Sequence, residues 1–117
     1  MGQPIVHFEI MGSDAKRLQQ FYADLFAWRI RPAGGPETGF YGMIDGGSSG
    51  LAGGIGQEPS GRTRVTVYVQ VPDLQAALDR AVSLGGRVAM PPVAVPGGPT
   101  MAQIADPDGN ITGLIRG

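Results

Sequence analysis

The sequence contains no cysteine, which excludes disulfide bonds, thiolate metal ligands and a cysteine nucleophile. Charge is also scarce, since charged residues make up 16% of the 117 residues and the formal net charge is -1. The nine basic residues, of which Lys16 is the single lysine, form no positive segment that could neutralise phosphates. We therefore expect no nucleic-acid partner.

Long apolar runs are missing as well. No segment approaches the roughly 18 apolar residues that a membrane-spanning helix needs. The first ten residues carry His7 and Glu9 within their apolar run and have no basic stretch of the kind that opens a secretory leader. We expect no membrane partner and a cytoplasmic protein. The 42% of hydrophobic residues suffice for one core, so residues 1–117 are predicted to form a single domain.

Glycine and proline are abundant, with twenty and ten residues, and they gather between the patterned segments. This distribution predicts short strands joined by turns. In the first half, Ser13 is expected to cap a helix that runs to about Phe26. Strands are expected around it at 5–10, 28–31, 40–45 and 51–56.

The second half repeats this order. Asp73 is expected to cap a helix that ends at Gly85-Gly86, and the expected strands are 65–71, 87–90, 101–105 and 111–115. Superposing Asp14 on Asp73 gives an offset of 59 residues that also aligns the apolar faces of the two opening strands. The sequence therefore predicts two βαβββ repeat units of about 1–58 and 59–117.

Four segments carry a family likeness: Val6-His7-Phe8-Glu9-Ile10, the stretch from Gln19 to Trp28, Val71-Pro72-Asp73-Leu74, and Asp106-Pro107-Asp108-Gly109-Asn110. Together they resemble the vicinal oxygen chelate superfamily, which contains glyoxalase I, bleomycin-resistance proteins and extradiol dioxygenases. Ala27 stands where such proteins usually have glycine. The resemblance implies a glyoxalase-like α+β domain: two tandem βαβββ units forming an open, mostly antiparallel barrel-like sheet, with helices outside and a ligand cavity between the units. It also implies a homodimer.

The resemblance further indicates where a metal would be held. In metal-dependent members, the ligands come from the first and fourth strands of each unit. These positions fall on His7 and Thr66 in the first strands, and on Gly53 and Gly113 in the fourth strands. Only His7 is a usable donor, whereas a catalytic divalent site usually takes about three protein ligands. We expect no metal and no other cofactor.

His7 and Glu9 lie two residues apart on the first strand and therefore share one face, the expected cavity face. An imidazole beside a carboxylate could bind a ligand or move a proton. Alternatively, His7 is a wall residue that hydrogen-bonds a neighbour, and Glu9 is half solvated at the strand end. The other candidate ligand-binding residues are neutral: Tyr68, Thr66, Gln70, Gln103, Tyr41 and Met43.

Such a wall suits an uncharged or weakly polar organic molecule. The first hypothesis is a metal-independent protein that binds or sequesters a small organic ligand, as the bleomycin-resistance branch does. The alternative is a lyase or isomerase that uses His7 and Glu9, with or without a divalent metal that a second subunit helps to hold. The sequence has neither a phosphate-binding G-x-x-x-x-G-K-[ST] loop nor a G-x-S-x-G nucleophile motif.

Overall fold

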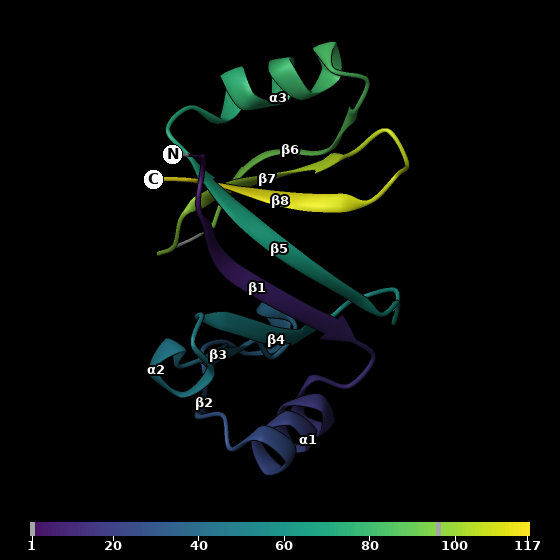
Figure 1. The fold of residues 1–117 in the computed structure, drawn as a ribbon. Helices are drawn as coiled ribbons and strands as arrows, with labels where there is room; N and C mark the ends of the chain where they lie inside the picture. The colour runs from purple at the N-terminus through teal and green to yellow at the C-terminus, as the bar shows by residue number, and fades with distance from the viewer. Residues whose placement is uncertain (1, 96) are drawn as a thin grey trace. The chain divides into compact units, whose positions relative to one another are not determined.

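The computed structural model describes residues 2–95 and 97–117, which form two units (Figure 1). The first unit is His7–Val65, and the second combines the residues up to Val6 with Thr66–Gly117. Strands β1 (Ile5–Gly12) and β5 (Arg64–Val71) therefore each contribute residues to both units. The single barrel-like sheet implied by the family resemblance and the single domain expected from chain length and composition both stay predictions.

The first unit is a small mixed sheet with helix α1 packed on it. Its strand order is β2-β3-β4-β1, with β1 and β4 parallel and the other two pairs antiparallel. After β1, the elements are α1 (Ala15–Phe26), β2 (Ile30–Pro32), a 3-10 helix (Pro36–Thr38), β3 (Gly42–Ile44), α2 (Gly46–Ser49) and β4 (Gly53–Gln57).

The second unit has the same plan, with strand order β5-β8-β7-β6 and the parallel pair β5–β8. Its elements after β5 are α3 (Leu74–Ser83), β6 (Arg87–Ala94), β7 (Thr100–Ala105) and β8 (Ile111–Arg116). The predicted α+β class with two βαβββ units is confirmed. Each unit combines one parallel with two antiparallel strand pairs, so antiparallel pairing dominates.

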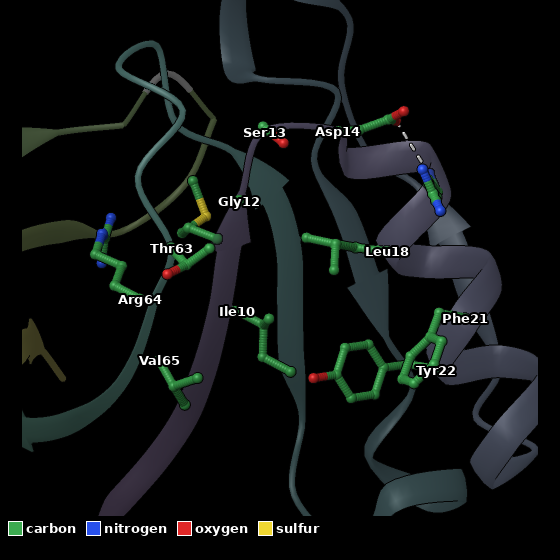
Figure 2. A pocket seen from close by; sticks show the side chains of 12 residues that line it. Ile10, Gly12, Ser13, Asp14, Leu18, Phe21, Tyr22, Thr63, Arg64 and Val65 are labelled. Carbon is green, nitrogen blue, oxygen red and sulfur yellow. Dashed lines mark hydrogen bonds between the residues drawn. The ribbon is translucent and has the colours of Figure 1, made fainter.

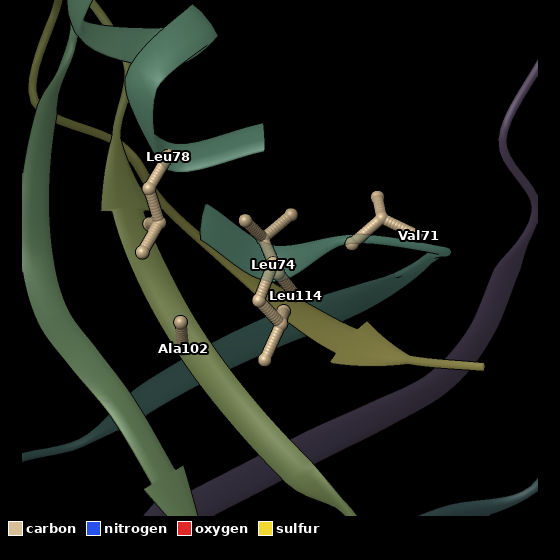
Figure 3. Packing of buried hydrophobic residues seen from close by; sticks show 5 residues of the cluster. All are labelled: Val71, Leu74, Leu78, Ala102 and Leu114. Carbon is tan, nitrogen blue, oxygen red and sulfur yellow. The ribbon is translucent and has the colours of Figure 1, made fainter. Parts of the chain in front are cut away.

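Each unit has its own apolar core beneath its long helix. In the first unit, Trp28 stacks on Tyr22 at 5.5 Å and meets Phe8 edge-on at 5.6 Å, above the buried residues Ile10, Ile44 and Ile55. In the second unit, two leucines of α3 pack onto the sheet (Figure 3). The buried residues of that cluster are Val71, Leu74, Leu78, Ala102 and Leu114.

Both long helices begin with an aspartate N-cap. The prediction that Ser13 caps α1 is wrong, because Asp14 is the N-cap and its carboxylate accepts a hydrogen bond from the Arg17 backbone nitrogen at 3.1 Å. Asp73 caps α3 in the same way, through the backbone nitrogen of Ala76 at 3.0 Å. The equivalence of Asp14 and Asp73, assumed in the 59-residue offset, is confirmed.

Several strand boundaries differ from the expectation. The expected strands at 40–45 and 51–56 are shortened, because Asp45 caps a short helix between them by accepting a hydrogen bond from the Gly47 backbone nitrogen. Strand β2 starts at Ile30 rather than residue 28. Strand β6 continues past residue 90 through two prolines, which is possible because β6 is the edge strand of its unit.

Candidate functional site

The strand register places the predicted site residues in two equivalent rows. In the first unit, Glu9 of β1 lies opposite Gly54 of β4, which in turn lies opposite Met43 of β3. In the second unit, the corresponding row is Tyr68, Gly113 and Gln103. Since paired residues share a face, each row lies on one side of its sheet.

The register corrects one alignment made from the sequence. Gly53 was matched to Gly113, but Gly53 pairs with Phe8, whose ring packs on the α1 side of the sheet. The equivalent of Gly113 is Gly54, which restores the offset of 59 residues in the fourth strands as well. A shift of one residue exchanges the two faces of a strand, so the earlier match pointed to the wrong side.

Both fourth-strand glycines lie beneath a tyrosine ring. A Cβ atom added at Gly54 would overlap the hydroxyl end of Tyr41, and one added at Gly113 would overlap the ring of Tyr68. Any side chain at these two positions would therefore displace a tyrosine. The phenol rings fill the space into which a fourth-strand metal ligand would project.

In the first unit, this tyrosine joins the two residues that the sequence singled out as catalytic candidates. The Tyr41 hydroxyl donates a hydrogen bond to Glu9 Oε2 at 2.9 Å. The Tyr41 hydroxyl oxygen also lies 3.1 Å from His7 Nε2. Glu9 is buried, with 7% of its surface exposed, so the alternative of a half-solvated glutamate at the strand end is wrong.

Arg64 also belongs to this network, and the sequence reasoning missed it. Its guanidinium forms ion pairs with Glu9 Oε1 at 3.1 Å and with Glu58 at 3.5 Å. A buried carboxylate needs a cation or several donors to offset its desolvation. That requirement was the signal in the sequence: a glutamate within an apolar strand calls for a cationic partner, although it does not say which one.

Burial lowers the pKa of His7 from its usual value of 6.5, and the nearby negative charge of Glu9 opposes this effect without cancelling it. The imidazole is therefore neutral at physiological pH, with one nitrogen protonated and the other able to accept a hydrogen bond. Neutral imidazole is also the form that can take up a proton.

The second unit places neutral groups at the matching positions. Tyr68 is 1% exposed and its hydroxyl accepts a hydrogen bond from Gln103 Nε2 at 3.1 Å. Thr66 is buried too, and Gln70 is partly buried. The structure thus brings Tyr68 and Gln103 together. That all the predicted wall residues line one cavity stays a prediction.

A separate hollow of about 610 Å³ lies in the first unit against α1 (Figure 2). Its lining shares Arg64 with the network but contains none of His7, Glu9 and Tyr41. Most of its wall is apolar or belongs to the start of α1: Ile10, Met11, Gly12, Ser13, Asp14, Arg17, Leu18, Phe21, Tyr22, Thr63 and Val65. Its position therefore differs from the site predicted from the sequence.

The side chains at the family's metal positions do not fit a divalent ion. With the corrected register these positions are His7, Thr66, Gly54 and Gly113, of which only His7 offers a strong donor. Within residues 2–95 and 97–117, no group of three or more His, Cys, Asp or Glu side chains is arranged to hold a metal.

Among the helices of the described part of the chain, none has the length and apolar character to cross a membrane.

Comparison with known proteins agrees with the fold. A family model described as a glyoxalase-like domain matches residues 7–115. The chain therefore belongs to the glyoxalase-like domain family. No curated protein sequence gives a significant match.

Three solved structures illustrate the likeness. A superfamily member from Vibrio splendidus 12B01 has a TM-score of 0.67 and 14% identity, covering 99% of this chain and all of its own. Methylmalonyl-CoA epimerase from Mycobacterium tuberculosis has a TM-score of 0.71 and 16% sequence identity, and the match covers 96% of this chain and 86% of the epimerase chain. A variant of the Streptomyces coelicolor epimerase, in complex with 2-nitronate-propionyl-CoA, has a TM-score of 0.69 and 19% sequence identity. This match covers 97% of this chain and 94% of the epimerase chain.

Proposed function

We propose that this protein binds or sequesters a small organic molecule through the sheet face that carries His7, Glu9 and Tyr41, without a resident metal. The observation that carries the proposal is the position of Tyr41 over Gly54. A phenol occupies the space of a metal-ligating side chain, and it is held there by hydrogen-bonding contacts with Glu9 and His7.

The chemistry of the row favours a polar but uncharged recognition surface. The charge of Glu9 is offset by Arg64, so the groups that characterise this face are a phenol and a neutral imidazole. The candidate residues of the second unit, Thr66, Tyr68, Gln70 and Gln103, are uncharged. Such groups can orient an organic ligand by hydrogen bonds while apolar surface supplies most of the affinity. The cytoplasmic location and the homodimer expected from the sequence belong to this proposal.

Native mass spectrometry and elemental analysis of the untagged protein test the proposal. We expect a co-purified organic molecule that dissociates on denaturation, and no metal in stoichiometric amount. Tyr41→Phe should weaken its retention, whereas Tyr22→Phe, which changes a tyrosine of the α1 core, should not. Near-stoichiometric zinc, nickel, manganese or iron would contradict the metal-free part of the proposal.

A second candidate function is an isomerase in which His7 moves a proton. The favouring observation is a neutral imidazole held next to a phenol and a carboxylate, the types of group that carry out general acid–base chemistry. Similarity in fold to methylmalonyl-CoA epimerases supplies a first substrate to try. If methylmalonyl-CoA incorporates deuterium at carbon in D2O with the wild-type protein but not with His7→Gln, isomerisation replaces sequestration as the function.

A further inference from the structure

The sheet face proposed to bind the ligand extends outward to the edge strand β2. In the register, Gly54 lies between Glu9 on one side and Met43 on the other. Met43 in turn lies opposite Arg31 of β2. Arg31 is therefore the outermost member of the row that contains the candidate site.

The neighbours of Arg31 indicate which side of the sheet it faces. Ile30, the residue before it, packs into the core beneath α1. On the adjacent strand β3, a Cβ atom added at Gly42 would meet the side chain of Gln19 in α1. Since successive residues of a strand point to opposite faces, Arg31 points away from α1, to the side that carries Tyr41.

A hollow of about 490 Å³ lies against this outer part of the row, with Arg31 and Met43 in its wall. Because Met43 belongs to both, the hollow adjoins the proposed ligand-binding face. The wall also contains Arg29 and Asp45, which form an ion pair at 2.7 Å through Asp45 Oδ2. The other carboxylate oxygen of Asp45 accepts a hydrogen bond from the Gly47 backbone nitrogen at 3.0 Å.

Arg31 has no such counter-ion. Its side chain is exposed, and it forms no ion pair with any residue in the described ranges. Both oxygens of Asp45 are already engaged, and its charge is offset by Arg29. The wall of the hollow therefore has one positive charge that no described side chain balances.

We infer that Arg31 binds a carboxylate group of the ligand, which makes the ligand an organic acid with an uncharged polar end at Tyr41 and His7. A guanidinium group pairs its N–H donors with both oxygens of a carboxylate, and one carboxylate matches one unbalanced positive charge. Two strand spacings of about 4.8 Å separate Gly54 from Arg31, so the ligand should be about 10 Å long, with an apolar body over Met43. This inference rests on the proposed function and names the class of its ligand.

NMR titration with two matched probes tests the inference. The acid probe is ω-hydroxyoctanoate, which has a hydroxyl at one end and a carboxylate at the other. The diol probe has the same chain, with a second hydroxyl in place of the carboxylate. At low salt we expect the acid to bind about fivefold more tightly, the effect of an ion pair with an exposed arginine. Added salt should reduce this preference. Equal affinities, or no binding of the acid, would overturn the inference.

Arg31→Gln is the decisive variant, and its exposed position at the sheet edge favours normal folding. It should remove the preference for the acid and leave the affinity for the diol unchanged. Arg31→Lys keeps the charge and should retain part of the preference. Arg62→Gln, which changes an exposed arginine outside the hollow, is the matched control and should leave both affinities unchanged. A preference that survives in Arg31→Gln would overturn the inference.

Tyr41→Phe separates this inference from the proposed function. Because it acts at the uncharged end of the ligand, it should weaken the binding of both probes alike. If it changes neither affinity while the preference for the acid still depends on Arg31, the proposed function fails and the carboxylate site remains. If both probes depend on Tyr41 but the acid is not preferred, the inference fails and the proposed function remains.

Discussion

The two units share a backbone plan but place different chemistry on it. At the first-strand position of the row, the first unit has Glu9 and the second unit has Tyr68. Both fourth strands have a glycine there, and both glycines lie beneath a phenol ring. In the second unit that phenol comes from the first strand, whereas in the first unit it comes from Tyr41, just before β3.

At this position of the row, the first unit therefore has a charged residue and the second unit a neutral one. Where Tyr68 pairs with a neutral amide, Glu9 requires both Tyr41 and Arg64. The comparison indicates that both units share the glycine and the phenol that covers it, and that the first unit combines them with the ion pair between Glu9 and Arg64. Four features that differ between the units can be probed by mutation or by pH, in order of decreasing expected effect.

Removing the cation of the first unit should have the largest effect on stability. Arg64→Met leaves the buried Glu9 carboxylate without its ion pair, and we expect the free energy of unfolding to fall by roughly 2–3 kcal/mol, less than for a fully buried pair because Arg64 is 29% exposed. Chemical denaturation measures this change. Adding Glu9→Gln to Arg64→Met should recover part of the loss, and a double variant no more stable than Arg64→Met would contradict the role assigned to the charge.

Replacing each fourth-strand glycine by alanine places a methyl group under the covering tyrosine and so compares the glycine–tyrosine contact in the two units. Gly113→Ala should cost about 2 kcal/mol, as overpacking does, because its Cβ would meet one edge of the Tyr68 ring, and Tyr68 is 1% exposed. Gly54→Ala should cost less, since its Cβ meets the far end of the partly buried Tyr41 side chain, which can move aside by giving up its contacts with Glu9 and His7. Thermal unfolding of both variants ranks the costs, and an equal or reversed order would argue against this account.

The ends of the long helices differ as well. The chain turns after α3 through Gly85, at a φ of 98°, but after α1 through Ala27, at a φ of 58°. Only glycine adopts this left-handed region without steric cost. We therefore expect Ala27→Gly to stabilise the protein by about 0.5 kcal/mol, the balance of relieved strain and added chain entropy. A lower melting temperature for Ala27→Gly would contradict this expectation.

The smallest expected effect is a pH dependence that arises from the first unit. Burial lowers the pKa of His7 in the folded state, so the unfolded chain binds its proton at a higher pH. His7 should therefore not affect stability above about pH 6.5, and should reduce it as the pH falls through the lowered pKa. Chemical denaturation of the wild type and of His7→Gln across this pH range isolates the effect. On acidification the wild type should lose more stability than His7→Gln, and a smaller loss in the wild type would refute the prediction.

The sequence predicted element order and helix positions well, because these depend on local signals. Alternation in the strands, the aspartate caps and the Gly85-Gly86 terminus each act over a few residues. The short helix after Asp45 was missed, since four small residues carry no helical periodicity. Similarly, the two prolines at 91 and 92 suggested a loop, although an edge strand accommodates them.

The site was predicted less completely, for a physical reason. His7 and Glu9 could be assigned to one face from spacing alone, and Tyr41 was a candidate. Their contacts depend on strand pairing, however, and an error of one residue in the fourth strand was enough to select Gly53 instead of Gly54. Arg64 lies 55 residues beyond Glu9 in the chain, and no local pattern connects the two.

The outer strands β2 and β6 have a consequence for behaviour in a crowded cell. An edge strand offers unpaired backbone groups on which another chain can add a strand. In these units, β2 has three residues and ends at Pro32, while β6 contains Pro91 and Pro92 and shifts register on both sides of Met90. Proline has no N–H to donate, and an irregular strand is a poor template. Pro91 and Pro92, which made β6 hard to recognise in the sequence, thus also make this edge a poor site for aggregation.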